Sequence, residues 1–374
     1  MFRFKFNGND SILDLKNNCI QLDGEDIELN DDSLNSPKKI YYKMNDDCNL
    51  NCIYCFQKKD KKAMKNINLR EYNEVISKSI NNEEYEIVIF GGEPFIEKNI
   101  RNLEYIFSTL EKEKKVSLFT NGCYSEKINM LIKENKEKIN CLIITIDGPE
   151  KIHNSRRILL NNNSYQTIIK NLIELQKESI NFTIQINLDK KNIEYTEDLF
   201  NDLHSKFGLK NIQISLNRVL RSEDTISELD LLYKYKDLII KYDYANIYLN
   251  SNLYINLAAY ISGSGYYKSR CAIGDTMVLD FSTQKIYSCP QNLDTEIGYF
   301  TNNSIILDDM KKNEMKNVAG KKNTKCKICE FSKICSFGCY LERKNLSGNC
   351  KEIINNSLNY ILKNFDCFFR MEEE

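Results

Sequence analysis

The sequence contains only two histidines and four prolines among its 374 residues, and it has no long apolar run. So few histidines argue against His-rich zinc or non-haem iron sites. Without a run of about 18 apolar residues a transmembrane helix is not expected, and the N-terminal stretch lacks the apolar core of a signal peptide. We therefore expect a cytoplasmic protein with no membrane partner.

The sequence also lacks an excess of charge of either sign, with 52 lysines and arginines against 53 aspartates and glutamates. This balance excludes a strongly cationic surface, so we expect no nucleic-acid partner. The chain does have material for a sizeable core, since hydrophobic residues make up 42% and include 22 tyrosines and 18 phenylalanines. Global disorder is therefore excluded.

Apolar runs alternate with amphipathic stretches after residue 38. The apolar runs, which we predict to be strands, are at 39–45, 86–92, 115–122, 141–148, 181–188 and 211–217. The amphipathic stretches, which we predict to be helices, are near 69–82, 98–113, 125–138, 164–179 and 194–207. This alternation is typical of βαβ units with a parallel sheet. Six units fit a partial barrel better than a closed eight-stranded one, and chemistry in such sheets lies at the C-terminal strand ends.

Changes in composition divide the chain into four parts. Residues 1–37 alternate short apolar runs with Asn, Asp and Gly, which predicts a short β-rich segment. Residues 38–225 hold the βα units, and residues 226–265 are predicted to form a helical bridge. Residues 266–374 form a small cysteine-rich domain. The predicted fold class is therefore α/β, with a TIM-like partial (β/α)6 barrel between a short β-rich segment and a cysteine-rich domain.

The 14 cysteines fall mainly into two groups, more than 200 residues apart. Disulfides are rare in a reduced compartment, so this clustering indicates metal or iron–sulfur ligation. The first group is C-x3-C-x2-C at Cys48, Cys52 and Cys55, just after the first predicted strand. Three thiolates can hold three corners of a [4Fe–4S] cube and leave the fourth iron open. The alternatives are three unrelated thiols or a zinc site, although zinc normally takes four ligands.

This cysteine motif, with an aromatic residue before its last Cys, resembles that of the radical S-adenosylmethionine (radical SAM) superfamily. The resemblance covers about residues 38–220 and continues through three strand-end motifs: GGEP at 91–94, TNG at 120–122 and TIDGP at 145–149. It implies that SAM chelates the open iron and is cleaved, after one-electron reduction of the cluster, to a 5′-deoxyadenosyl radical. It also implies an electron donor of the flavodoxin or ferredoxin type.

The same resemblance implies a set of SAM-binding residues. Gly91 and Gly92 would let backbone approach the methionyl amine, which Glu93 would hydrogen-bond. Thr145 would contact the ribose or carboxylate end of SAM. The remaining candidates are Asn121 and Asp147 in the same layer of strand ends and Phe56 beside the adenine. For each of them the alternative is a turn residue or a helix cap, and the sequence names no catalytic base.

The second cysteine group resembles the SPASM extension of radical SAM enzymes, which carries two auxiliary [4Fe–4S] clusters. By this resemblance Cys271, Cys289 and Cys339 bind auxiliary cluster I. Auxiliary cluster II takes the other four cysteines of the group, Cys326, Cys329, Cys335 and Cys350. We therefore expect three [4Fe–4S] clusters and SAM as cofactors. The cysteines outside both groups are predicted to be buried apolar residues or surface thiols: Cys19, Cys123, Cys141 and Cys367.

The tail departs from the SPASM pattern at two points. Gln284 stands where the family usually has a glycine, and no cysteine lies between Cys271 and Cys289. We therefore hypothesise that auxiliary cluster I has only three protein ligands. Its open iron would face solvent, take a side chain other than Cys, or bind a substrate thiolate, since metal coordination lowers the pKa of a thiol.

SPASM proteins mostly modify peptides or proteins, so we expect a maturase of a ribosomally made peptide. It would form a thioether or carbon–carbon crosslink, or oxidise a side chain. The first alternative is an anaerobic sulfatase maturase, which forms formylglycine. Pro290 follows Cys289 where those enzymes carry an Asp, which counts against it. The second alternative is a non-enzymatic iron–sulfur electron carrier, which the SAM-site motifs argue against. Residues 1–37 either pair with the peptide through a strand edge or cap the barrel.

Overall fold

The fold is built around an eleven-stranded sheet, ordered β14-β13-β12-β10-β9-β8-β6-β16-β17-β18-β19. The computed structural model describes residues 1–22, 24–30, 32–34, 37–57, 67–159, 163–242, 246–267, 272–273, 275–316, 326, 328–335, 339, 341 and 349–369. From β14 to β16 all neighbouring strands are parallel, and from β16 to β19 all are antiparallel. The fold is therefore α/β with a predominantly parallel sheet, as predicted.

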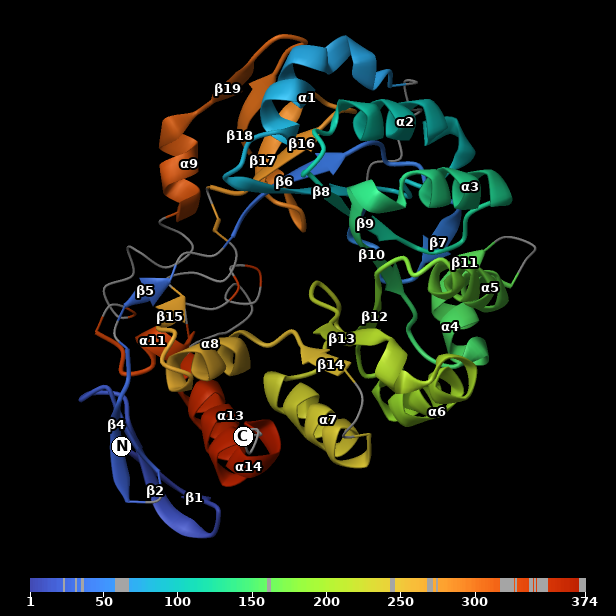
Figure 1. Ribbon diagram of the computed structural model, residues 1–374. Coiled ribbons are helices and arrows are strands. Elements are labelled where there is room, and N and C mark those ends of the chain that lie inside the picture. The colour runs from blue at the N-terminus through green and yellow to red at the C-terminus, as the bar shows by residue number, and fades with distance from the viewer. Residues whose placement is uncertain are drawn as a thin grey trace.

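The parallel part of the sheet curves into an open barrel with helices around its outside (Figure 1). Its strands are β6 (Lys38–Lys43), β8 (Tyr85–Phe90), β9 (Val116–Thr120), β10 (Ile139–Thr145), β12 (Phe182–Leu188), β13 (Gln213–Arg218), β14 (Asn246–Leu249) and β16 (Met277–Asp280). The helices that follow these strands are α1 (Asn73–Ile80), α2 (Ile100–Thr109), α3 (Glu126–Glu134), α4 (Glu150–Arg156), α5 (Ser164–Lys177), α6 (Thr196–Phe207) and α7 (Glu228–Lys241). All six predicted strands and all five predicted helices are present.

Two parts of this sheet differ from the sequence prediction. The stretch 226–262, predicted to be helical, contains α7, the strand β14 and α8 (Asn252–Ile261). The missed strand is only four residues long, so its apolar pattern is short. The cysteine-rich tail adds β16 beside β6, followed by β17 (Lys285–Cys289), β18 (Asn292–Phe300) and β19 (Ile305–Leu307). The sheet therefore runs across the predicted domain boundary near residue 265.

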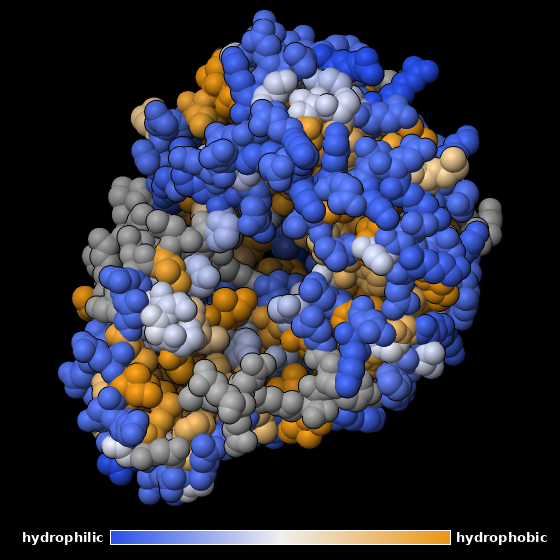
Figure 2. Space-filling model, viewed as in Figure 1, coloured by the Kyte–Doolittle hydropathy of each residue, from blue (hydrophilic) through white to orange (hydrophobic). Residues whose placement is uncertain are grey.

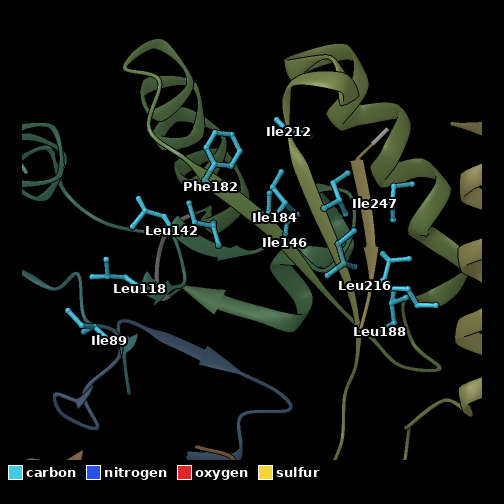
Figure 3. Packing of buried hydrophobic residues seen from close by; sticks show 14 of the residues in the cluster. Ile89, Leu118, Leu142, Ile146, Phe182, Ile184, Leu188, Ile212, Leu216 and Ile247 are labelled. Carbon is cyan, nitrogen blue, oxygen red and sulfur yellow. The ribbon is translucent and has the colours of Figure 1, made fainter. Parts of the chain in front are cut away.

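Alternate residues of each parallel strand form the main core, between the sheet and the helices. Figure 3 shows Leu118, Leu142, Ile184 and Leu216 from successive strands, and none of these side chains is exposed. Because successive side chains of a strand point to opposite faces, the intervening residues face the inside of the curved sheet.

The inner face of the sheet has two different halves. From β6 to β9 and on to β18 it carries a small apolar cluster separate from the main core: Tyr41, Phe90, Phe119, Val278, Tyr287 and Leu293. On β12 and β13 the alternating inward residues are polar: Thr183, Gln185, Asn187, Ser215 and Asn217. We call these halves the aromatic wall and the amide wall.

The N-terminal residues form a separate four-stranded antiparallel sheet of β1 (Phe2–Phe6), β2 (Asn9–Asp14), β3 (Cys19–Leu22) and β4 (Glu25–Glu28). The β-rich segment predicted from the sequence is thus present. It packs against the C-terminal helices, since the rings of Phe4 and Phe6 lie 4.9 and 5.4 Å from that of Phe365. In Figure 1 this sheet lies beside α13 (Cys350–Lys363) and α14 (Phe365–Phe368). This sheet therefore contacts the C-terminal helices, and its predicted pairing with a peptide stays a prediction.

The remaining elements lie in the tail and in two small ladders. The helices are α9 (Asp309–Lys316), α11 (Ser332–Cys335), α13 (Cys350–Lys363) and α14 (Phe365–Phe368). The ladders pair β7 (Leu50–Cys52) with β11 (Arg157–Leu159), and β5 (Ser33–Leu34) with β15 (Tyr266–Tyr267). No helix among the described residues is long and apolar enough to span a bilayer.

Candidate active site

The first cysteine group lies at the C-terminal end of β6, in the loop 44–57. Cys52 is buried, whereas Cys48 and Cys55 are half-buried. The middle of the loop is fixed by the antiparallel ladder between β7 and β11, and the amide of Ile53 donates to the carbonyl of Arg156 at 2.9 Å. The loop that carries the three thiols is therefore held by the segment that follows α4.

The chemistry of these side chains fits an iron–sulfur cluster. All three cysteines are free thiols, and two N–H groups point at the Cys48 sulfur, from the Leu50 amide at 3.4 Å and from Asn121 Nδ2 at 3.7 Å. Burial raises the pKa of Cys48 to about 11, so a bound metal would have to stabilise its thiolate. Within the described ranges no three His, Cys, Asp or Glu side chains lie close enough to hold a single metal ion. A cube does not require this, because each thiolate binds a different iron.

The cysteine loop passes so close to the turn after β8 that the two positions of the GGEP motif at 91 and 92 have no room for a side chain. Both have positive φ, at +96° for Gly91 and +49° for Gly92. A Cβ on Gly92 would lie 2.0 Å from the carbonyl oxygen of Asp47, a contact that no side chain tolerates. The Gly92 amide also donates to Gln57 Oε1 at 2.9 Å, and the Glu93 amide to the Asp47 carbonyl at 2.6 Å. These glycines therefore bring the β8 turn into contact with the cysteine loop, and their predicted approach to SAM stays a prediction.

Glu93 joins the ends of two neighbouring strands. Its carboxylate is buried and accepts three hydrogen bonds, from the Phe95 amide at 2.9 Å, from Thr120 Oγ1 at 2.6 Å and from the Asn121 amide at 2.6 Å. Burial raises the pKa of this carboxyl, and the three donors oppose that shift. Both oxygens already have protein partners. A contact with the SAM amine, which the sequence predicts, would have to use the lone pairs that remain.

The other predicted SAM contacts lie in the same layer but differ in their surroundings. Asn121 is buried, and its Nδ2 donates to Asn49 Oδ1 at 2.7 Å as well as to Cys48. Thr145 ends β10 and is 7% exposed, whereas Phe56 is 37% exposed, next to Cys55. The structure therefore brings Asn121 directly to the first cysteine, which motif spacing alone did not predict.

Asp147 lies in a buried polar network behind the cysteine loop. It accepts hydrogen bonds from the Tyr54 hydroxyl and, at 3.1 Å, from the Asn187 amide. Tyr54 in turn accepts a hydrogen bond from Arg157 Nη1 at 2.7 Å. Burial raises the pKa of Asp147, while the charges of Arg157 and Arg156 oppose that shift. Asp147 therefore anchors Tyr54, the residue directly before Cys55.

Sequence reasoning noted Tyr54 only as the aromatic residue of the cysteine motif, and it missed Arg157, Arg156 and Asp189 as parts of this site. Arg156 and Asp189 form a buried ion pair at 2.8 Å beside the same network. The available signal was the pair of adjacent arginines after TIDGP, because two consecutive buried cations need partners. Sequence spacing could not show that those partners come from the cysteine loop and from the end of β12.

The second cysteine group is described only in part. Cys289 ends β17, and the charge of Cys339 adds to the burial that raises the pKa of Cys289, so these two thiols lie near each other. Cys271, the third predicted ligand of auxiliary cluster I, lies outside the described residues. The predicted ligands of cluster II are Cys326 and Cys329, whose backbones share a hydrogen bond, Cys335 at the end of α11 and Cys350 at the start of α13. The predicted ligand sets of both auxiliary clusters therefore stay predictions.

Comparison with known proteins identifies the barrel. Residues 42–203 match the model of the radical SAM superfamily. The radical SAM cyclopropyl synthase TigE of Paramaledivibacter caminithermalis is 29% identical over 228 residues, 53% of this chain and 46% of TigE. The GTP 3′,8-cyclase of Desulforamulus reducens is 30% identical over 141 residues, 36% of this chain and 43% of the cyclase. This chain thus spans about half the length of these relatives.

Two solved structures share the fold over most of the chain. The structure of anSMEcpe with bound AdoMet superimposes with a TM-score of 0.67 at 17% identity, covering 90% of this chain and 99% of anSMEcpe. Streptococcus suis SuiB bound to its precursor peptide SuiA gives a TM-score of 0.60 at 17% identity, covering 84% of this chain and 74% of SuiB. The match to the radical SAM superfamily over residues 42–203 agrees with the resemblance that the motifs predict.

Proposed function

We propose that this protein is a radical SAM enzyme that modifies a peptide, by forming a thioether or carbon–carbon crosslink or by oxidising a side chain. The observation that carries the proposal is the meeting of the C-x3-C-x2-C loop with Glu93 and Asn121 at the C-terminal end of the parallel sheet. At this end of a barrel, catalytic groups from several strands converge. A [4Fe–4S] cluster with bound SAM would supply hydrogen-abstracting chemistry there.

The chain's own residues would hold and shield this chemistry. Cys48, Cys52 and Cys55 would ligate the cluster, and the N–H of Asn121 would stabilise the Cys48 thiolate. Thr145 and Asp147 come from the neighbouring strand end. The aromatic wall lies below this layer and would exclude water from a reactive carbon centre.

The interior of the sheet supports a peptide as substrate. Figure 2 shows a hollow near the centre of the face viewed in Figure 1, inside the curve of the sheet. On the inner face of the sheet the amide wall carries side-chain donors and acceptors, with contacts such as Gln185 Nε2 to Asn187 Oδ1 at 3.0 Å. Amide side chains match the donors and acceptors of a peptide backbone. SuiB with its precursor peptide and anSMEcpe with the Cp18Cys peptide share this fold and bind peptides.

Auxiliary clusters would add an electron path from the substrate. The proposal retains Cys271, Cys289 and Cys339 as ligands of auxiliary cluster I, with one iron open to a substrate thiolate. It also retains the other four tail cysteines as ligands of auxiliary cluster II. The electron donor is proposed to be of the flavodoxin or ferredoxin type. Pro290 after Cys289 again disfavours formylglycine formation.

The proposal is tested by anaerobic reconstitution followed by reduction with dithionite and SAM. Wild-type protein should bind about twelve iron atoms and release 5′-deoxyadenosine. The triple variant Cys48/Cys52/Cys55→Ala should bind about four fewer irons and release none. If the triple variant still forms 5′-deoxyadenosine, the assignment of this loop is wrong. Substrate class is tested by adding a cysteine-containing peptide library or GTP: the proposal predicts a change of mass in peptide only.

A further inference from the structure

Arg157 is the direct cross-strand neighbour of Cys52. The β7–β11 ladder pairs these two residues in register. Side chains directly opposite each other in an antiparallel pair lie on one face, with Cβ atoms about 5 Å apart. Arg157 is also buried, with 7% of its surface exposed. Arg157 therefore extends from the same face of the ladder as the second cysteine of the triad, away from solvent and near enough for its charge to interact with that of the Cys52 thiolate.

Among the residues that the structure describes, no carboxylate forms a direct ion pair with Arg157, and the charge of Asp147 acts on it across the Tyr54 hydroxyl. Its Nη1 donates to the neutral Tyr54 hydroxyl at 2.7 Å, and its Nε has no hydrogen-bond partner among the described residues. The neighbouring Arg156 differs, because it forms an ion pair with Asp189 at 2.8 Å. A buried cation without a contacting anion is costly unless an anion approaches it. The side of Arg157 that faces Cys52 is where such an anion would lie.

We propose that Arg157 is a positioning residue that sets the reduction potential of the cluster held by Cys48, Cys52 and Cys55. This inference rests on the proposed function. A cluster with thiolate ligands gains one more negative charge when an external donor passes it one electron. A fixed positive charge beside Cys52 stabilises that reduced form, since the interaction is strong away from water. Arg157 would thereby raise the potential and ease the reduction that precedes cleavage of SAM.

The neighbouring groups provide tests of opposite sign. Asp147 reaches Arg157 through the Tyr54 hydroxyl and brings a negative charge into the same network. Asp147→Asn is isosteric and removes that charge, so the potential should rise. Tyr54→Phe removes the hydroxyl that both side chains contact and leaves both charges in place. Arg70→Gln is a matched control, because Arg70 lies over the Tyr105 ring on an exposed surface.

The experiment is a redox titration of the reconstituted protein without SAM, followed by EPR of the reduced cluster. For Arg157→Gln we expect about tenfold less reduced cluster at a given potential, which corresponds to a shift of about −59 mV for a one-electron couple. Asp147→Asn should shift the potential upward. Arg157→Lys should keep most of the wild-type value, and Arg70→Gln all of it.

Several results would overturn the inference. An unchanged potential in Arg157→Gln contradicts it, and so does a Tyr54→Phe variant that reproduces the whole shift. If Arg157→Gln weakens SAM binding but leaves the reduction potential unchanged, Arg157 acts on SAM and not on the cluster. If Arg157→Gln does not fold, Asp147→Asn decides, because an unchanged or lower potential contradicts the charge argument. Failure of wild-type protein to load the triad would refute the proposed function itself, together with this inference.

Discussion

The two cysteine groups are supported very differently by the rest of the molecule. The loop with Cys48, Cys52 and Cys55 is held by a two-stranded ladder and by hydrogen bonds from the ends of β8 and β9. Cys289 lies in a hairpin, near Cys339 from a distant part of the tail. The first site is therefore shaped by the barrel itself. For the second, the proposed ligands come from separate elements of the tail and would depend more on the proposed clusters to hold them together.

The largest expected difference between the two groups is in SAM cleavage. The double variant Cys289/Cys339→Ala should lose about four of about twelve irons and keep forming 5′-deoxyadenosine, because the first site does not depend on it. Product from a peptide substrate should disappear. Iron analysis measures the loss of iron, and chromatography measures 5′-deoxyadenosine and the peptide product. A double variant that no longer cleaves SAM would show that the two sites are not independent.

A second prediction concerns Glu93, which supports only the first site. Glu93→Ala leaves three buried donors without a partner, so we expect a loss of about 3 kcal/mol or more in the free energy of unfolding. Chemical denaturation of the barrel measures this loss.

The same variant tests the predicted contact of Glu93 with SAM. Loss of that contact in Glu93→Ala should cost roughly 1.5–3 kcal/mol of binding free energy, or about ten- to a hundredfold in SAM affinity. Glu93→Gln should lose less. If a folded Glu93→Ala protein binds SAM with unchanged affinity, Glu93 does not contact SAM and has a structural role only.

The pH dependence of stability should report the burial of the same carboxyl. Burial raises the pKa of Glu93 above its ordinary value of 4.5. The folded state therefore binds this proton more tightly than the unfolded state, so the stabilisation is present at low pH and is lost as the pH rises through the raised pKa. Between pH 4.5 and neutrality Glu93→Gln should decline less in stability than wild type. A steeper decline in Glu93→Gln would contradict this assignment.

The smallest effect is expected for Cys123, which lies near the first site without belonging to it. It is buried, burial raises its pKa to about 12, and its thiol contacts the Ser164 carbonyl at 3.5 Å. Cys123→Ala should cost about 1 kcal/mol or less and leave the iron content unchanged. Loss of iron in this variant would mean that the triad was assigned with the wrong cysteine.

The strands and helices of the parallel sheet were predictable, because mostly apolar strands and amphipathic helices leave strong periodic signals. The strand β14 was missed because four residues give almost no pattern. The site was predictable as a set of motifs, whereas the contacts within it were not. The contact between Asn121 and Cys48 and the network of Tyr54, Asp147 and Arg157 join residues more than 70 positions apart, and only tertiary packing brings them together.

The central claim is that the first cysteine group holds a cluster with an iron that is open to SAM. The most direct measurement is the EPR spectrum of the reduced protein before and after addition of SAM, in a variant that carries only this cluster, Cys289/Cys339/Cys326/Cys329→Ala. The account predicts that SAM changes the spectrum, because it binds the open iron. A spectrum that is identical with and without SAM would contradict the account.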